Sequence, residues 1–218
     1  MKEKSKNIKI LIITIIIILL SISGITYYKY NNGVVLTLLH DNSPRQMMGF
    51  VMQTKNKTIV IDGGLKEDSE NLQNKIKECG NKVDAWFLTH PHMDHVQAFL
   101  DIVENTDIQI DKIYATYNDL DWYKQYETSR IEEIENFFEV IEDEKIKDKV
   151  EQVQLNQKIN IDNVKCEILG TKNPEITTNP INNSSMVIKM YLGKKSILFL
   201  GDTGAESSQK LIENEING

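Results

Sequence analysis

The most apolar stretch of the chain lies close to its N-terminus. Residues 10–26 contain no charged side chain. As a helix rising 1.5 Å per residue they would span roughly 26 Å, which is at the short end of what crosses a bilayer. Tyr27, Tyr28 and Tyr30 follow the run, and tyrosines are common at the depth of the lipid headgroups. A buried strand or core helix is the alternative, but a soluble helix is rarely apolar on every face. The pattern therefore predicts a transmembrane helix over residues 10–26.

Beyond residue 34 the hydrophobic pattern alternates between the periods of strands and helices. Runs of β-branched and leucine residues bounded by turn residues predict strands, whereas apolar positions every three or four residues predict helices. Strands are predicted at residues 34–39, 49–54, 58–62, 84–88, 113–115, 151–154, 164–169, 185–191 and 196–200. Helices are predicted at residues 67–79, 96–103, 130–141 and 205–214. The order of these elements indicates a mixed α/β (α+β) domain over residues 34–218.

The composition fits one folded domain with an appendage. The chain has 218 residues, of which 40% are hydrophobic, and it contains aromatic residues and only two cysteines. That content excludes a disordered chain, a disulfide-scaffold protein and a zinc site of four cysteines. Cys79 and Cys166 are expected to be buried thiols, with a single disulfide as the less favoured alternative.

The net charge of -7 is unevenly distributed along the chain. Four lysines and one glutamate give residues 1–9 a charge of +3, so the remaining residues sum to -10. Lysines next to a membrane helix stay in the cytoplasm, which puts the rest of the chain outside the cell. Residues 21–23 are a poor cleavage site, so an uncleaved signal anchor is favoured over a cleaved signal peptide. We expect a basic cytoplasmic tail, a single-pass anchor in the lipid of the cell membrane, and an extracellular domain. That acidic domain lacks the basic track of a protein that grips long nucleic acid.

Three of the four histidines fall within six residues. His90, His92, Asp94 and His95 form the pattern His-x-His-x-Asp-His just after the predicted strand 84–88. Imidazoles two positions apart at the end of a strand point the same way and can reach one divalent ion. Asp94 and His95 would then face a second position about 3.5 to 4 Å away, as in hydrolytic sites with two metal ions. Neutral imidazole with carboxylate favours one or two Zn²⁺ ions, with Mn²⁺ or iron as alternatives.

A further carboxylate follows another apolar strand. Asp202 lies just after the predicted strand 196–200, in the segment Gly-Asp-Thr-Gly, where a loop can come close to a metal ion. Its position before the helix 205–214 also suits an N-cap. Because the histidine motif is present, we favour Asp202 as a metal ligand.

The residues around these motifs resemble the metallo-β-lactamase superfamily. The likeness rests on residues 59–64, 84–95 and 199–202, and it extends from about residue 34 to the end of the chain. Within the superfamily, residues 182–187 are similar to the branch that contains the extracellular domain of the competence protein ComEC. The resemblance implies an αββα sandwich with the metal ions at one edge, between the two sheets.

The same resemblance implies a role for each motif residue. His90 and His92 would hold the first metal ion, Asp94 and His95 the second, and Asp202 would bridge the two. It further implies hydrolysis, in which a metal-activated hydroxide attacks an ester, an amide or a phosphodiester. Asp94 would orient that hydroxide, which makes it the candidate catalytic residue.

Three other residues are candidates to support a ligand or to contact substrate. Asp62 matches a position that commonly supports the metal-binding loop in the superfamily. Asn183 lies in the segment 182–184, where the superfamily usually has another histidine, and the ComEC-like branch tolerates its absence. His40 follows the first predicted strand on a loop that can approach the site. A polar loop histidine without such a role is the favoured alternative for His40.

The chain has no histidine after His95, whereas superfamily members usually have another ligand near the C-terminus. A helix ending at Gly218 is an unusual end for this fold, so we expect a truncated product or a fragment. The expected function is a membrane-anchored extracellular metal-dependent hydrolase of a small or oligomeric ester or phosphoester. The alternative is a membrane-tethered domain that an incomplete site leaves inactive.

Overall fold

The computed structural model describes residues 13–18, 21, 33–40 and 48–217, and the chain divides into two compact units, Met1–Val34 and Val35–Gly218. In the first unit, residues 13–18 and Ser21 are helical, and the Ser21 hydroxyl donates a hydrogen bond to the Ile17 carbonyl. Most of the transmembrane helix predicted over residues 10–26 lies outside the described residues. Of the helices that are described, none combines the length and the apolar character that a bilayer crossing requires.

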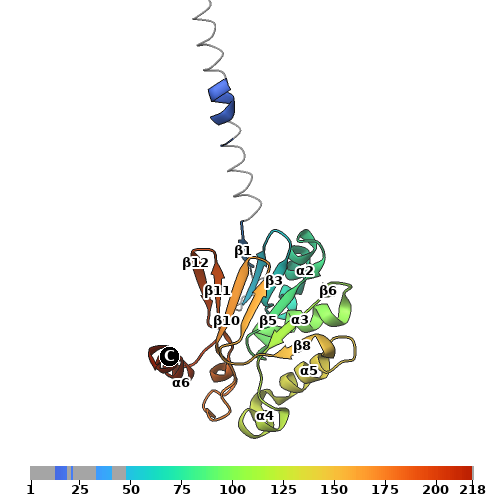
Figure 1. Cartoon of the computed structure of the whole chain (residues 1–218). Coiled ribbons are helices and arrows are strands. Elements are labelled where there is room, and N and C mark those ends of the chain that lie inside the picture. Colours follow the sequence, from blue (N-terminus) through green and yellow to red (C-terminus); the bar gives the residue numbers. More distant parts are fainter. Residues whose placement is uncertain (1–12, 19–20, 22–32, 41–47, 218) are drawn as a thin grey trace, which may run out of the picture. The chain divides into compact units, whose positions relative to one another are not determined.

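The larger sheet of the second unit has six strands in the order β1-β2-β3-β5-β7-β8 (Figure 1). The strands β1, β2 and β3 are antiparallel, whereas β3, β5, β7 and β8 are parallel. Their bounds are β1 (Val35–Leu38), β2 (Gly49–Gln53), β3 (Thr58–Asp62), β5 (Ala85–Leu88), β7 (Ile113–Ala115) and β8 (Val150–Gln152). Because parallel strands end at the same edge of a sheet, the residues that follow β3, β5 and β7 leave it together.

The smaller sheet has four antiparallel strands in the order β12-β11-β10-β9. Their bounds are β9 (Lys158–Ile161), β10 (Val164–Gly170), β11 (Val187–Leu192) and β12 (Lys195–Phe199). A separate parallel pair joins β4 (Lys82–Val83) to β6 (Gln109–Ile110). The turn at Gly193, predicted between the last two strands, has a φ of 66° that favours glycine.

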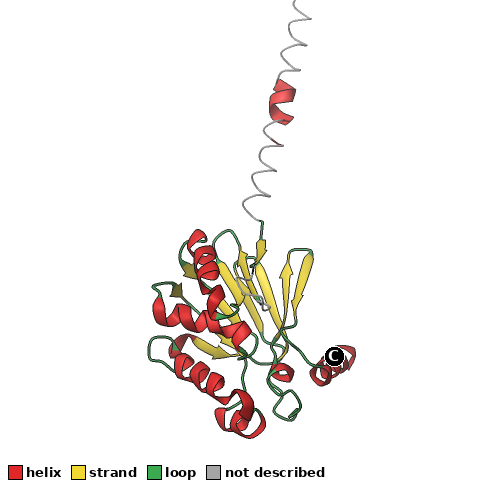
Figure 2. Ribbon diagram, turned by 180° about the vertical axis from the view of Figure 1, so that it is seen from behind, coloured by secondary structure: helices red, strands yellow, loops and turns green. Residues whose placement is uncertain are grey.

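Helices cover one face of the larger sheet, and the smaller sheet covers the other (Figure 2). The helices are α2 (Ser69–Glu78), α3 (Met93–Asn105), α4 (Leu120–Tyr126), α5 (Ile131–Ile141) and α6 (Ala205–Asn217), with 3-10 turns η1 (Lys66–Asp68), η2 (Thr128–Arg130), η3 (Lys147–Lys149) and η4 (Asn182–Ser184). The helices α2, α3 and α5 bury apolar side chains against the larger sheet, and α6 packs beside β10 of the smaller one. The result is a mixed α/β fold with its core in two layers.

Alternation along the strands builds both layers of the core. Val60 and Trp86 belong to the cluster that packs against the helices. Residues that alternate with such positions along each strand point to the opposite face of the sheet. On that face, the Phe50 ring of β2 lies 5.2 Å from the Phe199 ring of β12. This contact joins the two sheets. Both cysteines are free thiols, as the sequence predicts; Cys166 is buried, whereas Cys79 is only half-buried.

Several elements differ from the prediction. The helix expected at 96–103 begins at Met93, so Asp94 and His95 lie in its first turn rather than in a loop. The predicted pattern also missed α4 and β9, together with the short pair β4 and β6. These elements have two to seven residues, which is too short for a hydrophobic period to be recognised.

Candidate metal centre

Three chain segments bring the motif residues together. Asp62 is the last residue of β3, and His90 lies two residues beyond the end of β5. His92 is the N-cap of α3, with an extended φ of -78° and ψ of 145°, and His95 follows in the first turn of that helix. The loop after β12 brings Asp202 to the same place. The ligand atoms of His90, His95 and Asp202 all lie within 4.8 Å of one another, so these three residues could hold a metal ion.

His95 is the most confined of these side chains. It is fully buried, and its Nδ1 lies 2.9 Å from a carboxylate oxygen of Asp62. Its Nε2 lies 3.3 Å from Oδ1 of Asp202 but makes no hydrogen bond to the described residues. A buried nitrogen without a hydrogen bond is costly unless it has another partner. A metal ion would be that partner, so the donor set fits a metal.

His90 approaches the same point from the strand side. Its Nε2 lies 3.1 Å from Nδ1 of His92, and its ring centre lies 4.0 Å from that of His95. Its Nδ1 lies 3.0 Å from the hydroxyl of Thr89. Three imidazoles packed this closely need either a shared cation or a fixed set of tautomers. Metal-binding histidines have such a set, because one ring nitrogen binds the ion and the other bonds to a neighbouring group.

Asp62 holds His95 and the start of the histidine motif in place through hydrogen bonds. Its carboxylate accepts hydrogen bonds from the Thr89 backbone N–H and the Thr89 hydroxyl, both at 2.8 Å, as well as from His95 Nδ1. The Trp86 indole donates to the Asp62 carbonyl at 3.0 Å. Asp62 has a φ of 54°, a region that aspartate adopts more readily than most residues. A carboxylate bound to the far nitrogen of a metal-binding histidine fixes the tautomer and strengthens the ligand.

The loop that carries Asp202 is pressed against the motif. Gly201 has a φ of 54°, and a Cβ there would lie 3.0 Å from Cβ of Thr89. The Asp202 backbone N–H donates to the Ser185 hydroxyl at 3.2 Å. The alternative role of Asp202 as an N-cap of α6 is filled instead by Asn183, whose Oδ1 accepts the N–H of Ser207 in the first turn at 3.1 Å.

The other candidate residues lie outside the three-ligand cluster. Asp94 is half-buried one residue before His95, and its charge acts on His92. The amide of Asn183 bonds to Thr178 and to residues of α6, so its contacts are structural. His40 is exposed, and its carbonyl accepts a hydrogen bond from Asn71 of α2. Sequence reasoning missed the hydroxyls of Thr89 and Ser185, although Thr89 directly precedes the histidine motif.

The surroundings of the three motif histidines shift their pKa values in opposite directions. Burial, then the neighbouring His95 and His92, lowers the pKa of His90 well below its usual value. Burial, then the charge of Arg130, lowers the pKa of His92 to about 4. Burial also disfavours charge on His95, but Asp62 and Asp202 outweigh it and raise its pKa to about 10. The His95 imidazole in turn lowers the pKa of Asp202. His90 and His92 are therefore neutral at pH 7, the form that binds metal.

These shifts predict acid lability of the metal-free protein. His90 and His92 bind protons more weakly when folded than when unfolded, so their contribution to stability is full above pH 6.5 and is lost as the pH falls toward 4. His95 has the opposite sign, and its contribution changes only above pH 6.5. Urea unfolding of EDTA-treated protein should show stability falling between pH 6.5 and 4.5. His92→Gln should flatten that dependence, His40→Gln should not, and an unchanged slope in His92→Gln would contradict the assignment.

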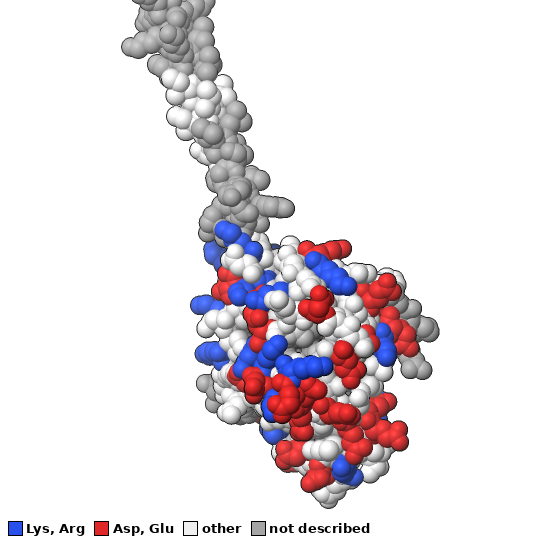
Figure 3. Space-filling model, turned by 90° about the vertical axis from the view of Figure 1, so that its right-hand side faces the viewer, with Lys and Arg blue, Asp and Glu red and all other residues white. Residues whose placement is uncertain are grey.

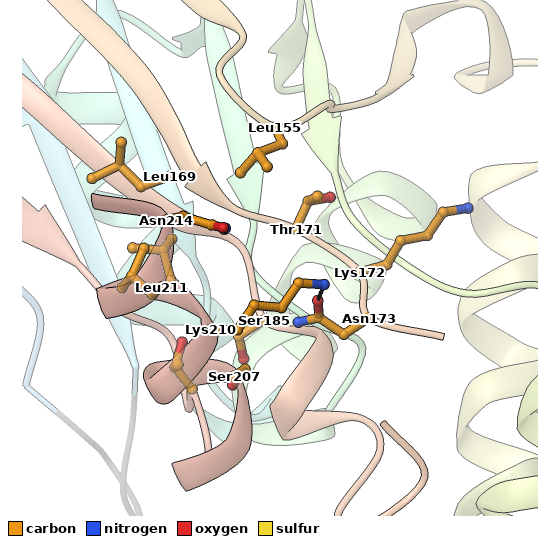
Figure 4. Close-up of a pocket in the computed structure, with 13 residues that line it drawn as sticks. Leu155, Leu169, Thr171, Lys172, Asn173, Ser185, Ser207, Lys210, Leu211 and Asn214 are labelled. Atoms are coloured by element: carbon orange, nitrogen blue, oxygen red, sulfur yellow. Dashed lines mark hydrogen bonds between the residues drawn. The ribbon is translucent and has the colours of Figure 1, made fainter. Parts of the chain in front are cut away.

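A narrow cavity under α6 lies close to the Asp202 loop but is too small for a substrate. It measures about 50 Å³, whereas ligand pockets measure about 300 to 1,000 Å³. Figure 4 shows Leu155, Leu169 and Leu211 along its wall and Lys210 reaching Asn173. The Lys210 Nζ lies 2.5 Å from Asn173 Oδ1 and 2.6 Å from Glu175. The cavity thus lies in the interface between α6 and the loop after β10.

One family model matches most of the chain. The model of the metallo-beta-lactamase superfamily matches residues 45–216. Among solved structures, the chain is similar to the metallo-beta-lactamase fold protein YhfI from Bacillus subtilis, with 14% identity over 78% of this chain and 62% of that one and a TM-score of 0.47. It is also similar to BJP-1, a subclass B3 metallo-beta-lactamase of Bradyrhizobium japonicum, with 16% identity over 85% and 73% and a TM-score of 0.47. A metallo-beta-lactamase from Staphylococcus aureus gives 14% identity over 78% and 42% and a TM-score of 0.48. The chain spans less than two thirds of the length of YhfI. No curated protein sequence matches it.

Proposed function

Since the chain belongs to the metallo-β-lactamase superfamily, we propose that it is a metal-dependent hydrolase anchored in the cell membrane, with its catalytic domain outside the cell. Members of the superfamily are generally metal-dependent hydrolases, and zinc is their usual metal. The observation that carries the proposal for this chain is the cluster of His90, His95 and Asp202, in which a buried imidazole nitrogen faces a carboxylate and makes no hydrogen bond within the described residues.

The ligands divide between two positions. His90 and His92 would hold one zinc ion, Asp94 and His95 would hold a second, and Asp202 would contribute its carboxylate to both. The metal supplies the Lewis acidity that makes water a nucleophile near neutral pH and that stabilises charge on the leaving oxygen. Asp94, in the first turn of α3, would accept a hydrogen bond from the attacking water and so orient it. Asp62 keeps the His95 ring in one tautomer throughout.

The N-terminal region supplies the location. Residues 10–26 form the anchor, residues 1–9 stay in the cytoplasm because of their lysines, and residues 34–218 lie outside. Protease added to intact cells should then digest the domain, and protection of the domain would contradict this orientation.

The substrate is a small or oligomeric phosphodiester, ester or amide met outside the cell. Residues 182–187 support a place in the ComEC-like branch. The charge of the domain argues against binding of long nucleic acid, since aspartates and glutamates gather over the lower part of the face in Figure 3. A short or monomeric substrate fits this surface better than a long polymer.

A panel of chromogenic substrates tests the proposal. The zinc-loaded full chain, purified in detergent, should hydrolyse at least one of a phosphodiester, a neutral ester and a β-lactam. The rate should vanish with EDTA and return with zinc, because the reaction needs the metal. A chain that binds zinc but hydrolyses none of the three would favour the inactive, membrane-tethered alternative.

A further inference from the structure

We propose that Arg130 binds a negatively charged group of the substrate beside the metal centre and so selects anionic substrates, phosphodiesters or carboxylates, over neutral ones. The inference rests on the proposed hydrolase function and adds to it a residue that fixes the substrate class.

The segment between β7 and α5 begins beside the histidine motif. Leu88, at the end of β5, pairs with Ala115, at the end of β7, in parallel register. The residues after each strand therefore leave the sheet at adjacent points, and His90 is the second residue after Leu88. Residues 116–130 start their path at the edge of the sheet that carries the metal ligands.

Hydrogen bonds hold this segment against the loops that support Asp202. The Thr116 hydroxyl lies 2.8 Å from that of Thr171, and the Asn118 amide donates to the Ser184 hydroxyl at 2.8 Å. Asn118 and Ser184 are both buried, so their hydrogen bond is part of the packed interior. Ser184 is adjacent to Ser185, which accepts the Asp202 N–H. The start of the segment is thus tied to the loops next to Asp202.

Arg130 closes the segment at the N-terminus of α5. The helix α5 packs against α3, whose first turn carries Asp94 and His95. The helix α5 leads into the start of β8, which is parallel to β7, so its C-terminal end lies toward the opposite edge of the sheet. Its N-terminal end, with Arg130, therefore lies toward the edge that carries the motif. The effect of the Arg130 charge on the pKa of His92 agrees with this position at the rim of the site.

The guanidinium is available to a ligand. Its side chain is 48% exposed, and its ion pair is a long one, 3.5 Å to the exposed carboxylate of Glu133. A guanidinium has five N–H donors, and no other ion pair of Arg130 is present in the described part of the chain. Arginine is also rare here, with two residues against 23 lysines, and the other, Arg45, lies outside the described residues.

The chemistry of arginine fits an oxyanion. Its planar fork matches the paired oxygens of a carboxylate or a phosphodiester better than the point charge of lysine does. The domain as a whole is acidic and repels anions, so a cation at the mouth of the site offsets that repulsion where substrate must bind. A neutral ester would gain nothing from this contact.

The test compares Arg130→Gln with the unaltered full chain, both zinc-loaded in detergent, on three substrates. These are bis(p-nitrophenyl) phosphate, nitrocefin, which carries a carboxylate, and the neutral p-nitrophenyl acetate. We expect kcat/KM for the anionic substrate that is turned over to fall roughly 10- to 100-fold, mostly through KM, since a hydrogen-bonded charge contact is lost. Acetate hydrolysis should stay within about twofold, and zinc content should not change. The anionic substrate that loses rate identifies the phosphate or the carboxylate as the group bound.

A matched control is Lys124→Gln, which removes one positive charge from α4, where Lys124 pairs with Glu135 at 3.1 Å. It should leave all three rates unchanged. An equal loss on acetate and on the anionic substrate in Arg130→Gln would overturn the inference, as would no loss on either.

Binding of inorganic phosphate separates this inference from the proposed function because it needs no turnover. Calorimetric titration of the zinc-dialysed chain should give a phosphate Kd that Arg130→Gln raises at least about fivefold. If no substrate is hydrolysed but this difference is found, the hydrolase proposal fails and the role of Arg130 stands. Equal phosphate affinity in the two proteins, or no binding by either, overturns the role of Arg130.

Discussion

Replacing His95 by alanine should abolish zinc retention and lower hydrolysis at least about a thousandfold, because the ring is both a ligand and the link between two carboxylates. Its Nδ1 lies 2.9 Å from Asp62 and its Nε2 lies 3.3 Å from Asp202. Without the ring, a buried Asp62 loses a charged partner, and the metal-free protein should lose about 3 to 5 kcal/mol of unfolding free energy. Zinc content after dialysis and circular dichroism measure the two effects separately.

A second variant keeps this result interpretable if His95→Ala fails to fold. His95→Gln retains an amide donor toward Asp62, so it should fold while still losing zinc. His40→Ala removes the one histidine outside the motif and should retain both zinc and activity. Full zinc occupancy in a folded His95→Gln protein would contradict the assignment of His95 as a ligand.

Replacing Asp62 by asparagine should weaken zinc binding about 10- to 100-fold, although Asp62 itself need not touch the metal. One oxygen of Asp62 accepts bonds from both the Thr89 hydroxyl and His95, and the other accepts the Thr89 N–H. An amide nitrogen cannot accept at either place, so a buried donor is left unpaired and the unfolding free energy should fall by about 1 to 3 kcal/mol. Competition for zinc with a chromophoric chelator measures the affinity.

Asp84→Asn is the matched control for this substitution. Asp84 immediately precedes β5, at the opposite end of that strand from the motif, and its carboxylate accepts bonds from Lys57 and from the Thr58 N–H. The change should destabilise the fold to a similar extent and leave zinc affinity unaltered. Equal loss of affinity in the two variants would mean that Asp62 acts only through general stability.

The sequence predicted the elements whose side chains carry a clear period. The alternating strands, the hairpin at residues 49–62 and the helix at 130–141 are all present, because each buries one face in a core. The start of α3 was placed three residues late, since a run of histidines and aspartate reads as a loop. The anchor predicted over residues 10–26 stays a prediction.

For the metal centre too, local features could be predicted from the sequence, whereas contacts between distant residues could not. The spacing of His90, His92 and His95 was visible because the motif lies within six residues. The support from Asp62 depends on the parallel pairing of β3 with β5. This pairing brings Asp62 to Thr89, which is 27 positions away in the sequence, and to His95, which is 33 positions away. No local pattern distinguishes Arg130 from a solvated helix residue, so the role that we propose for it could be inferred only from the fold. Interactions formed by tertiary structure leave no periodic trace in the sequence.

Zinc content of the unaltered full chain is the measurement that tests the account most directly. Protein dialysed first against zinc and then against metal-free buffer should retain between about one and two equivalents by mass spectrometry of the metal, as a site of three histidines and two carboxylates predicts. Retention of less than about a tenth of an equivalent by folded protein would contradict the metal centre, and with it the proposed hydrolysis.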